Sequence, residues 1–421
     1  MANACGVDFG TSNSTVGWIG PNRGSGAGSV MLALEDGKAT LPSVVFFNAD
    51  DDEVSYGRAA LAGYLAGYEG RLMRSLKSLL GTSLMDGQTE VAGRSLPFKL
   101  LLSQFIGEVK RRAEREAGRE FTSAVFGRPV FFVDDSAESD KLAEDTLAGI
   151  ARAVGFKDIA FQYEPIAAAF DYESQIGAEE LVLIADIGGG TSDFSLVRLS
   201  PERARKSERR QDILATGGVH IGGTDFDKYL SLSSVMPLLG YQSLLNNNSA
   251  IPSSYYFNLA TWHTINLAYT KKIWTQLADV VRDAREPDKL MRLQRLIDER
   301  AGHWLAMKVE EGKIALSDAS SVELVLERLA PPHTLQLERS GFEAAIMHLV
   351  GAIDQTVLKL LADAGVAPDA VDTVFFTGGS SGVRMLRERI GALLPQARKV
   401  EGDLFGSIGA GLALDAVRKF N

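Results

Sequence analysis

Short apolar segments separated by glycine-rich turns fill the first 50 residues and predict a β-meander. Cys5–Phe9 and Thr15–Ile19 are its first two strands, joined by a tight turn at Thr11–Asn13. Ser29–Leu34 and Ser43–Asn48 continue the pattern. We therefore expect the chain to begin with a sheet.

An amphipathic helix is predicted over Lys99–Gly118. Its apolar residues recur at helical spacing, and it ends in a turn rich in Lys and Arg followed by glycine, as helices commonly do. The residues that share its apolar face are Leu102, Phe105, Ile106 and Val109.

A strand and a second helix are predicted next. Ala124–Val133 has the composition of a strand, and Asp135–Glu138 resembles a capping box that opens a helix running to Val154. The residues at helical spacing in this helix are Leu142, Leu147, Ile150 and Val154.

The second half of the chain repeats this alternation. Leu181–Ile187 and Phe194–Leu199 are apolar strands joined by a glycine-rich turn. The charged run Pro201–Gln211 is most simply a solvated turn. A helical region spans about residues 258–317, and Val371–Phe376 is a strand that leads through a glycine cluster into a helix.

Two segments in the two halves share one plan. Val7–Ser12 and Ala185–Thr191 each consist of an apolar strand, an Asp, an apolar residue, glycine and small hydroxyl residues. The separation of these two segments along the chain is far longer than one repeat of a solenoid protein. The internal similarity therefore predicts two similar α/β lobes coupled at a hinge.

Composition narrows the function classes. The 421 residues are 45% hydrophobic and 23% charged, as in soluble globular proteins of roughly two to four domains. A net charge of −10 argues against binding to nucleic acid or acidic membranes. The single cysteine, Cys5, excludes an internal disulfide and fits a reducing cytosol. The N-terminus lacks the features of a secretion signal and no apolar run reaches 18 residues, so we expect a cytoplasmic protein without a membrane partner.

The first hairpin has the chemistry of a phosphate site. Its strand carries Asp8, and the turn that follows contains Gly10, Thr11, Ser12 and Asn13. Glycine lets backbone N–H groups approach an anion, and such a nest of donors suits phosphate. A carboxylate beside phosphate is favourable when a hard cation such as Mg²⁺ lies between them.

The second hairpin offers the same groups, and two facing hairpins would hold a triphosphate between the lobes. A third glycine cluster, Thr377–Gly382, lies between a strand and a helix and could accept a base or ribose. The residues concerned are Asp186, Gly188, Gly189, Gly190, Thr191 and Asp193 in the second hairpin, and Gly378, Gly379 and Ser380 in the third cluster.

In this order the motifs resemble the actin-like ATPase superfamily, and within it the nucleotide-binding domain of DnaK-type heat shock 70 kDa chaperones. The nearest resemblance is to the short YegD-like proteins of that family. The resemblance covers essentially the whole chain. The motifs that carry it are Gly6–Ser14, Gln162–Ala169, Asp186–Asp193, His220–Asp227, Glu310–Ser317, Gly378–Ser380 and Asp403–Gly411.

The resemblance implies a role for each matching residue. Asp8 and Asp186 would hold Mg²⁺ through water, with K⁺ as a further candidate ion, and the two glycine-rich turns would hold the phosphates of ATP or ADP. Lys77 would bind the γ-phosphate and the attacking water, and Glu164 would orient that water together with Asp186, Thr191 or Asp193. The residues implied around the rest of the nucleotide are Gly222, Gly223, Glu310, Lys313, Ser317, Gly378, Gly379, Ser380 and Asp403.

Three departures from the family pattern stand out. Ile314 and Gly382 occupy the positions of the two arginines that sandwich adenine, which weakens the expectation of adenine specificity. The segment between the fourth and fifth motifs, about residues 228–317, is longer than expected and is a candidate partner or client surface. Its aromatic residues are most simply core residues or, alternatively, an interaction face: Tyr255, Tyr256, Phe257, Trp262 and Trp274. The chain stops after the closing helix, so we expect it to lack a peptide-binding domain.

The resulting prediction is an α/β protein of actin-like ATPase fold with a central nucleotide cleft. Residues 1–175 form lobe I, residues 176–395 form lobe II, and residues 396–421 form a closing helix that returns to lobe I. The predicted function is an ATP-binding, slowly hydrolysing chaperone-family protein in which nucleotide switches lobe closure. A catalytically silent nucleotide binder and an actin-like filament protein are the alternatives, and a sugar kinase fits least.

Overall fold

The computed structural model describes residues 3–20, 30–91, 94–133, 136–206, 208–403 and 406–420. Four predictions fall partly outside these residues. They are the start of the strand at Ser29, Asp135 of the capping box, Ser207 of the charged run, and Leu404 and Phe405 of the last motif.

A mixed sheet organises the first half of the chain. Its strands run in the order β11-β10-β1-β2-β3, with β4 also paired to β2. The hairpin β1-β2 is antiparallel, whereas β1, β10 and β11 are parallel. The strands are β1 (Ala4–Phe9), β2 (Asn13–Trp18), β3 (Val30–Met31), β4 (Leu41–Pro42), β10 (Ser123–Arg128) and β11 (Asp158–Tyr163).

The second large sheet repeats this topology. Its order is β14-β13-β12-β17-β18, with an antiparallel hairpin β12-β13 and parallel strands β12, β17 and β18. The predicted internal similarity thus extends from the two hairpins to the order and direction of the strands around them. The strands are β12 (Glu180–Ile187), β13 (Ser192–Leu199), β14 (Ile213–Val219), β17 (Thr373–Thr377) and β18 (Arg398–Glu401).

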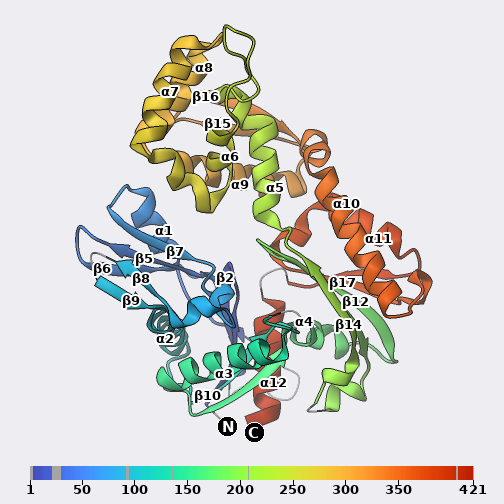
Figure 1. The fold of residues 1–421 in the computed structure, drawn as a ribbon. Coiled ribbons are helices and arrows are strands. Elements are labelled where there is room, and N and C mark those ends of the chain that lie inside the picture. Colours follow the sequence, from blue (N-terminus) through green and yellow to red (C-terminus); the bar gives the residue numbers. More distant parts are fainter. Residues whose placement is uncertain are drawn as a thin grey trace.

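Smaller sheets extend each half at its outer end (Figure 1). The order β6-β5-β7 and the hairpin β8-β9 belong to the first half, and the hairpin β15-β16 belongs to the second. Their bounds are β5 (Val44–Asn48), β6 (Glu53–Tyr56), β7 (Gly70–Arg74), β8 (Gln88–Val91), β9 (Arg94–Pro97), β15 (Ser321–Leu326) and β16 (His333–Glu338).

The two large sheets are joined by helices α4 (Glu164–Glu173) and α12 (Ser407–Phe420). One apolar cluster combines Val125 of the first sheet, Ile184 of the second, Ala167 of α4 and Leu412 of α12. Figure 1 shows both helices between the two halves. The two halves therefore share one core at the base of the molecule.

The two amphipathic helices form as predicted, with small corrections. In α2 (Phe98–Ala117) the four predicted apolar residues are buried, and Gly118 ends the helix in the left-handed region. In α3 (Ala137–Ala153) the Ser136 hydroxyl caps the first turn. The expectation that Leu142 belongs to the apolar face is wrong, because its side chain is 56% exposed.

The helical region of the second half consists of several short helices. Tyr255 and Tyr256 are buried in its core, whereas Phe257 and Trp274 are exposed, so its aromatic residues divide between core and surface. The elements are α5 (Gly223–Leu230), α6 (Ser254–Ala260), the 3₁₀-helix η7 (Trp262–Tyr269), α7 (Lys271–Asp283), α8 (Pro287–Asp298) and α9 (Gly302–Asp318).

The small sheet β6-β5-β7 is covered by helix α1 (Gly57–Leu65). The second large sheet is covered by helix α10 (Arg339–Asp363), against which α11 (Arg384–Leu393) packs. By length and composition α10 could cross a membrane. Core helices pass the same test, and α10 buries Ile346, Val350 and Ile353 in the large core of the second half.

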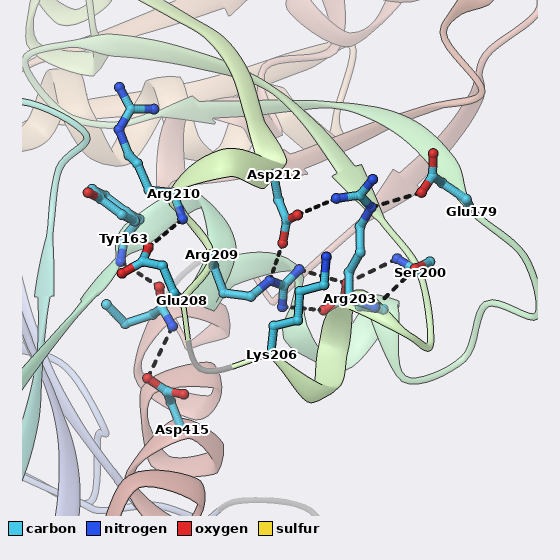
Figure 2. A network of polar contacts seen from close by, with 12 residues as sticks. Tyr163, Glu179, Ser200, Arg203, Lys206, Glu208, Arg209, Arg210, Asp212 and Asp415 are labelled. Carbon is cyan, nitrogen blue, oxygen red and sulfur yellow. Dashed lines mark hydrogen bonds and ion pairs between the residues drawn. The ribbon is translucent and has the colours of Figure 1, made fainter.

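The expectation of a solvated turn at Pro201–Gln211 is wrong. Arg209 is fully buried, and its guanidinium donates to both carboxylate oxygens of Glu173 at 2.8 and 2.9 Å. It also binds Asp212, which binds Arg203 in turn, and Figure 2 shows both arginines directed at Asp212. The charges of this run are therefore partly an internal ion network that fixes the segment to α4.

Candidate functional site

The two glycine-rich hairpins have closely matched geometry. Asp8 pairs with Thr15 across β1-β2, and Asp186 pairs with Asp193 across β12-β13. In the first turn, a side chain at Gly10 would collide with the backbone carbonyl of Asn13, so the tight turn requires glycine there.

The two turns lie against each other. A Cβ atom on Gly189 would be 2.6 Å from the Ser12 hydroxyl oxygen, although the two residues belong to different sheets. In the second turn the Gly188 amide donates to the Thr191 carbonyl at 2.9 Å, and the Thr191 hydroxyl donates to Asp193 at 2.7 Å. The structure thus brings both predicted phosphate turns to one place.

A lysine and a glutamate meet beside these turns. Lys77 lies on the 3₁₀-helix η1 (Leu76–Leu79), and its ammonium is 2.5 Å from the carboxylate of Glu164, the first residue of α4. Both side chains are largely buried. The ends of two distant elements therefore hold an ion pair inside the molecule.

The carboxylates of Asp8 and Asp186 lie in the field of this pair. Burial, followed by the charges of Asp193, Glu164 and Asp8, raises the pKa of Asp186 to about 8. Burial and then Glu164 raise the pKa of Asp8 to about 7, against the opposing charge of Lys77.

The pKa of Lys77 is also raised, which for a lysine means that the charged form is favoured. Burial by itself would lower its pKa, but the carboxylates of Glu164, Asp8 and Asp186 together raise it. One ammonium thus faces several carboxyl groups, and the raised pKa values of Asp8 and Asp186 show that their negative charges lack sufficient positive partners. Such a cluster favours a cation.

The donor set suits Mg²⁺. Asp8 and Asp186 present carboxylate oxygens, the ligands this ion prefers, and phosphate and water complete its shell in nucleotide sites. Among the residues that the structure describes, no group of three or more His, Cys, Asp or Glu side chains is arranged to hold a metal. An ion held here would therefore rely on water and ligand oxygens as well as these two side chains.

The segment that contains Gly222 and Gly223 braces the second turn. The Gly223 and Thr224 amides donate to the carbonyls of Gly188 and Gly189 at 3.0 and 2.8 Å. A Cβ on Gly222 would lie 2.7 Å from the Gly189 carbonyl, so this approach also requires glycine.

Of the three residues expected on the adenosine helix α9, Lys313 is occupied by protein partners. Its buried ammonium donates to Asp227 at 2.9 Å and to the Gly223 carbonyl at 3.2 Å. Glu310 is exposed and Ser317 is half-buried. Lys313 thus ties the helix to the glycine segment.

The third glycine cluster lies beside the carboxylates. Gly378 has a φ of 79° and a side chain there would collide with Asp186, so glycine is required on both counts. Ser380 is buried against Gly223, and Gly379 is exposed. This cluster therefore adjoins both the second hairpin and the segment that braces it.

Among the described residues, the structure shows no contact between Asp403 and the two hairpins. Asp403 follows β18, and its carboxylate lies against Gly406 at the start of α12. Ile314 is 59% exposed at the position expected for a family arginine.

Ser43 is a site residue that the sequence did not reveal. Its hydroxyl donates to the Gly10 carbonyl at 2.7 Å, and its amide donates to the Ser12 carbonyl at 2.9 Å. It therefore fixes the first phosphate turn from the residue that links β4 to β5. A serine at the start of a strand carries no signal for such a role.

The comparison with protein families identifies the family of the chain. The Hsp70 protein model matches residues 100–235 and 278–416, more than half of the chain. The chain belongs to the Hsp70 family. This is a family of ATP-binding chaperones with an actin-like ATPase fold, so the predicted family and fold class are confirmed.

Curated relatives agree with this assignment. A chaperone protein HscA homolog from Shewanella sp. (strain ANA-3) is 28% identical over 98% of the chain and 58% of its own length. Chaperone protein DnaK from Thermosipho africanus is 26% identical over 91% of the chain and 54% of its own length. The chain thus spans a little over half the length of these relatives. The nearer resemblance to YegD-like proteins stays a prediction.

The family match begins at residue 100 and is interrupted at residues 236–277. This stretch includes Asn246–Asn248, Tyr255–Phe257 and η7, all within the segment expected to be longer than in relatives. The charged helix Pro287–Arg300, expected as part of the same excess, lies inside the matched region.

Proposed function

We propose that this Hsp70-family chain binds an adenine nucleotide with Mg²⁺ between its two sheets and hydrolyses ATP slowly. The observation that carries the proposal is the contact between the two glycine-rich turns, Ser12 against Gly189, beside a buried cluster of excess carboxylates. A metal-bound polyphosphate satisfies both features, because the turns donate N–H groups and the carboxylates attract the ion.

Each residue has a role that follows from its position. Asp8 and Asp186 would hold Mg²⁺, and the bound ion would supply charge neutralisation for the phosphates. The turns at Gly10–Asn13 and Gly188–Thr191 hold the phosphate oxygens. Lys77 has three N–H donors and uses one for Glu164, so two remain for the γ-phosphate and the attacking water.

Glu164 supplies the acceptor that orients this water. Its carboxylate is already fixed by Lys77, and Asp193 with Thr191 lies on the opposite hairpin. Positioning and charge neutralisation are the main requirements of phosphoryl transfer, so no covalent intermediate is needed.

The adenosine part of the nucleotide is assigned to Glu310, Lys313 and Ser317 on one side and to Gly378–Ser380 and Asp403 on the other. Because Lys313 is held by Asp227, it reaches the ribose only by sharing its protons or leaving this partner. K⁺ is a further candidate ion for the phosphate region.

Nucleotide binding is expected to close the lobes, residues 1–175 and 176–395, with residues 396–421 as the closing helix. A ligand that touches both hairpins favours the closed state by its difference in affinity. Exposed Phe257 and Trp274 make the helical part of the second half the proposed contact for a protein partner or client. We place this activity in the cytoplasm.

Calorimetry with ATP, ADP and GTP, with and without Mg²⁺, tests binding, and phosphate release tests hydrolysis. We expect Mg²⁺-dependent binding of ATP and ADP and slow release that Lys77→Ala reduces. Binding without any release that depends on Lys77 would identify a silent nucleotide binder. Absence of binding under all conditions would overturn the proposal.

A further inference from the structure

The two halves of the molecule also touch at their outer ends, away from the hairpins. Tyr64 on α1 and Arg74 on β7 come from the first half, and Trp262 and Asn266 on η7 and His303 on α9 come from the second. We call these five residues the clasp.

The clasp is built around the imidazole of His303, which is only 4% exposed. The rings of Tyr64 and Trp262 lie on it at centroid distances of 4.8 Å, at interplanar angles of 83° and 76°. The Tyr64 hydroxyl donates to Asn266 at 2.7 Å. The His303 ring is therefore enclosed by aromatic groups from both halves.

Arg74 completes the contact from the first half. Its guanidinium carbon lies 4.3 Å from the centroid of the Trp262 ring. Burial lowers the pKa of Arg74, while the carboxylates of Glu310 and Asp227 act to raise it. The clasp thus extends toward the residues proposed to surround the adenosine.

Two positions connect the clasp to the nucleotide site. His303 and Glu310 lie on the same helix α9, and Arg74 lies three residues before Lys77. Separation of the two halves at their outer ends must break the contact of Tyr64 with His303 and Asn266. It must also break the contact of Arg74 with Trp262. Trp262 and Asn266 lie in residues 236–277, which the family model does not match.

We propose that the clasp is a pH-sensitive closure of the cleft: it holds only while His303 is neutral, and protonation of His303 opens it and speeds nucleotide release. The release part rests on the proposed nucleotide function. The closure itself rests on contacts that involve no ligand.

The surroundings of His303 disfavour its charged form. Burial, together with the positive charge of Arg74, lowers its pKa to about 4, although a hydrogen bond with the Trp262 backbone acts in the opposite direction. The other titratable groups at the clasp are the hydroxyl of Tyr64 and the nearby Tyr269, and both face the cation Arg300. These groups offer no carboxylate to stabilise an imidazolium.

The sign of the pH effect follows from this environment. When the clasp opens, His303 loses the Tyr64 ring and the nearby charge of Arg74, so its pKa rises toward its ordinary value of 6.5. Below this value protonation increasingly favours the open state, until the closed state also protonates near pH 4. The two pKa values correspond to about a 30-fold shift toward the open state at pH 5 relative to pH 8.

The first test follows the His303 ring by NMR as a function of pH in the full-length chain without nucleotide. We expect a His303 pKa at least one unit below the ordinary value, and Tyr64→Ala should return it toward 6.5. Titration of His303 near 6.5 in the unmodified chain would overturn the proposal whether or not the chain binds nucleotide.

The second test measures release of a fluorescent ADP analogue between pH 5 and pH 8. Asp8 and Asp186 also titrate, so the signal is the difference between the unmodified chain and His303→Phe, which keeps a ring but cannot be protonated. We expect the variant to lose an acid-induced acceleration of about 30-fold.

His348→Phe is the matched control. This histidine packs on Tyr229 at 4.4 Å within the second half alone, so its replacement should leave the pH profile unchanged. His303→Gln repeats the test should the Phe variant fail to fold. Identical profiles for the unmodified chain and a folded His303 variant would overturn the proposal. If no analogue binds, the proposed nucleotide function fails while the NMR titration still decides the clasp.

Discussion

Two buried charged clusters in this molecule differ in how their charges are matched. At the base of α4, the guanidinium of Arg209 pairs with the carboxylates of Glu173 and Asp212, and Arg203 pairs with Asp212 and with the half-exposed Glu179, so each carboxylate has a guanidinium partner. At the other end of α4, Lys77 faces Glu164 and, beyond it, further carboxylates of both hairpins.

The difference shows in the pKa values. Burial would lower the pKa of Arg209, but Glu173 and Asp212 raise it, so the network keeps its ions charged. Between the two hairpins, burial and mutual repulsion raise the pKa values of Asp8 and Asp186 to about 7 and about 8. A matched cluster fixes the structure, and an unmatched cluster is prepared for a cationic ligand.

Removal of Arg209 should have the largest effect. Arg209→Ala leaves Glu173 and Asp212 buried with insufficient positive charge, which costs about 3–5 kcal/mol of folding free energy. Denaturant unfolding measures this loss. Arg210→Ala is the matched control. Arg210 is the exposed neighbour of Arg209, so its replacement should cost less than about 1 kcal/mol of folding free energy. A similar small loss for both would show that the buried network is not structural.

Asp186→Asn should separate binding from stability. Since folding raises the pKa of Asp186, the folded state holds a proton that the unfolded state loses above about pH 4, and folding stability falls as pH rises toward 8. The variant should therefore be more stable than the unmodified chain at pH 8 in the absence of ligand, and the difference should shrink as pH falls toward 4.

The same variant should lose Mg²⁺-dependent nucleotide affinity by about 100-fold, or about 2.7 kcal/mol. Thermal unfolding and calorimetry on one sample measure both effects. Asp369→Asn, at an exposed position, should change neither. A variant that is destabilised yet binds normally would contradict the distinction between the matched and the unmatched cluster.

Lys77→Ala should lower turnover at least tenfold and leave binding near that of the unmodified chain, because the ammonium acts on the transferred phosphate. Single-turnover phosphate release gives the rate and calorimetry gives the affinity. Lys99→Ala, which removes an exposed ion pair with Asp86, is the control. Unchanged turnover in Lys77→Ala would remove this residue from the mechanism.

Gly382→Arg should have the smallest effect. A guanidinium plane restored beside the base should tighten adenine nucleotide binding by about 1–2 kcal/mol. A competition assay of ADP against GDP measures it, and Gly341→Arg on α10, which has open space around it, is the control. No change in either nucleotide would show that the base does not lie there.

Local pattern predicted the regular elements well. The strands that carry Asp8 and Asp186 and the apolar face of α2 follow from alternation and helical spacing alone. The strand predicted to reach Val133 ends at Arg128, because Pro129 follows and has no N–H to continue the ladder. This local signal was present in the sequence.

The site was predicted only as far as residue type and order reveal it. Glycine spacing placed both turns, but neither the partnership of Lys313 with Asp227 nor the role of Ser43 can be seen in a single sequence. The buried Arg209 was missed for the same reason, since a charged run normally indicates solvent and only its distant partner Glu173 explains its burial.

The most direct test of the charge imbalance is proton release on nucleotide binding. Calorimetry of Mg·ADP binding at pH 7, in buffers of different ionisation enthalpy, counts the protons that leave as the carboxylates of Asp8 and Asp186 meet the ion. We predict release of about one proton per nucleotide at pH 7, falling toward zero above pH 9. Binding with no proton release at pH 7 would contradict the account.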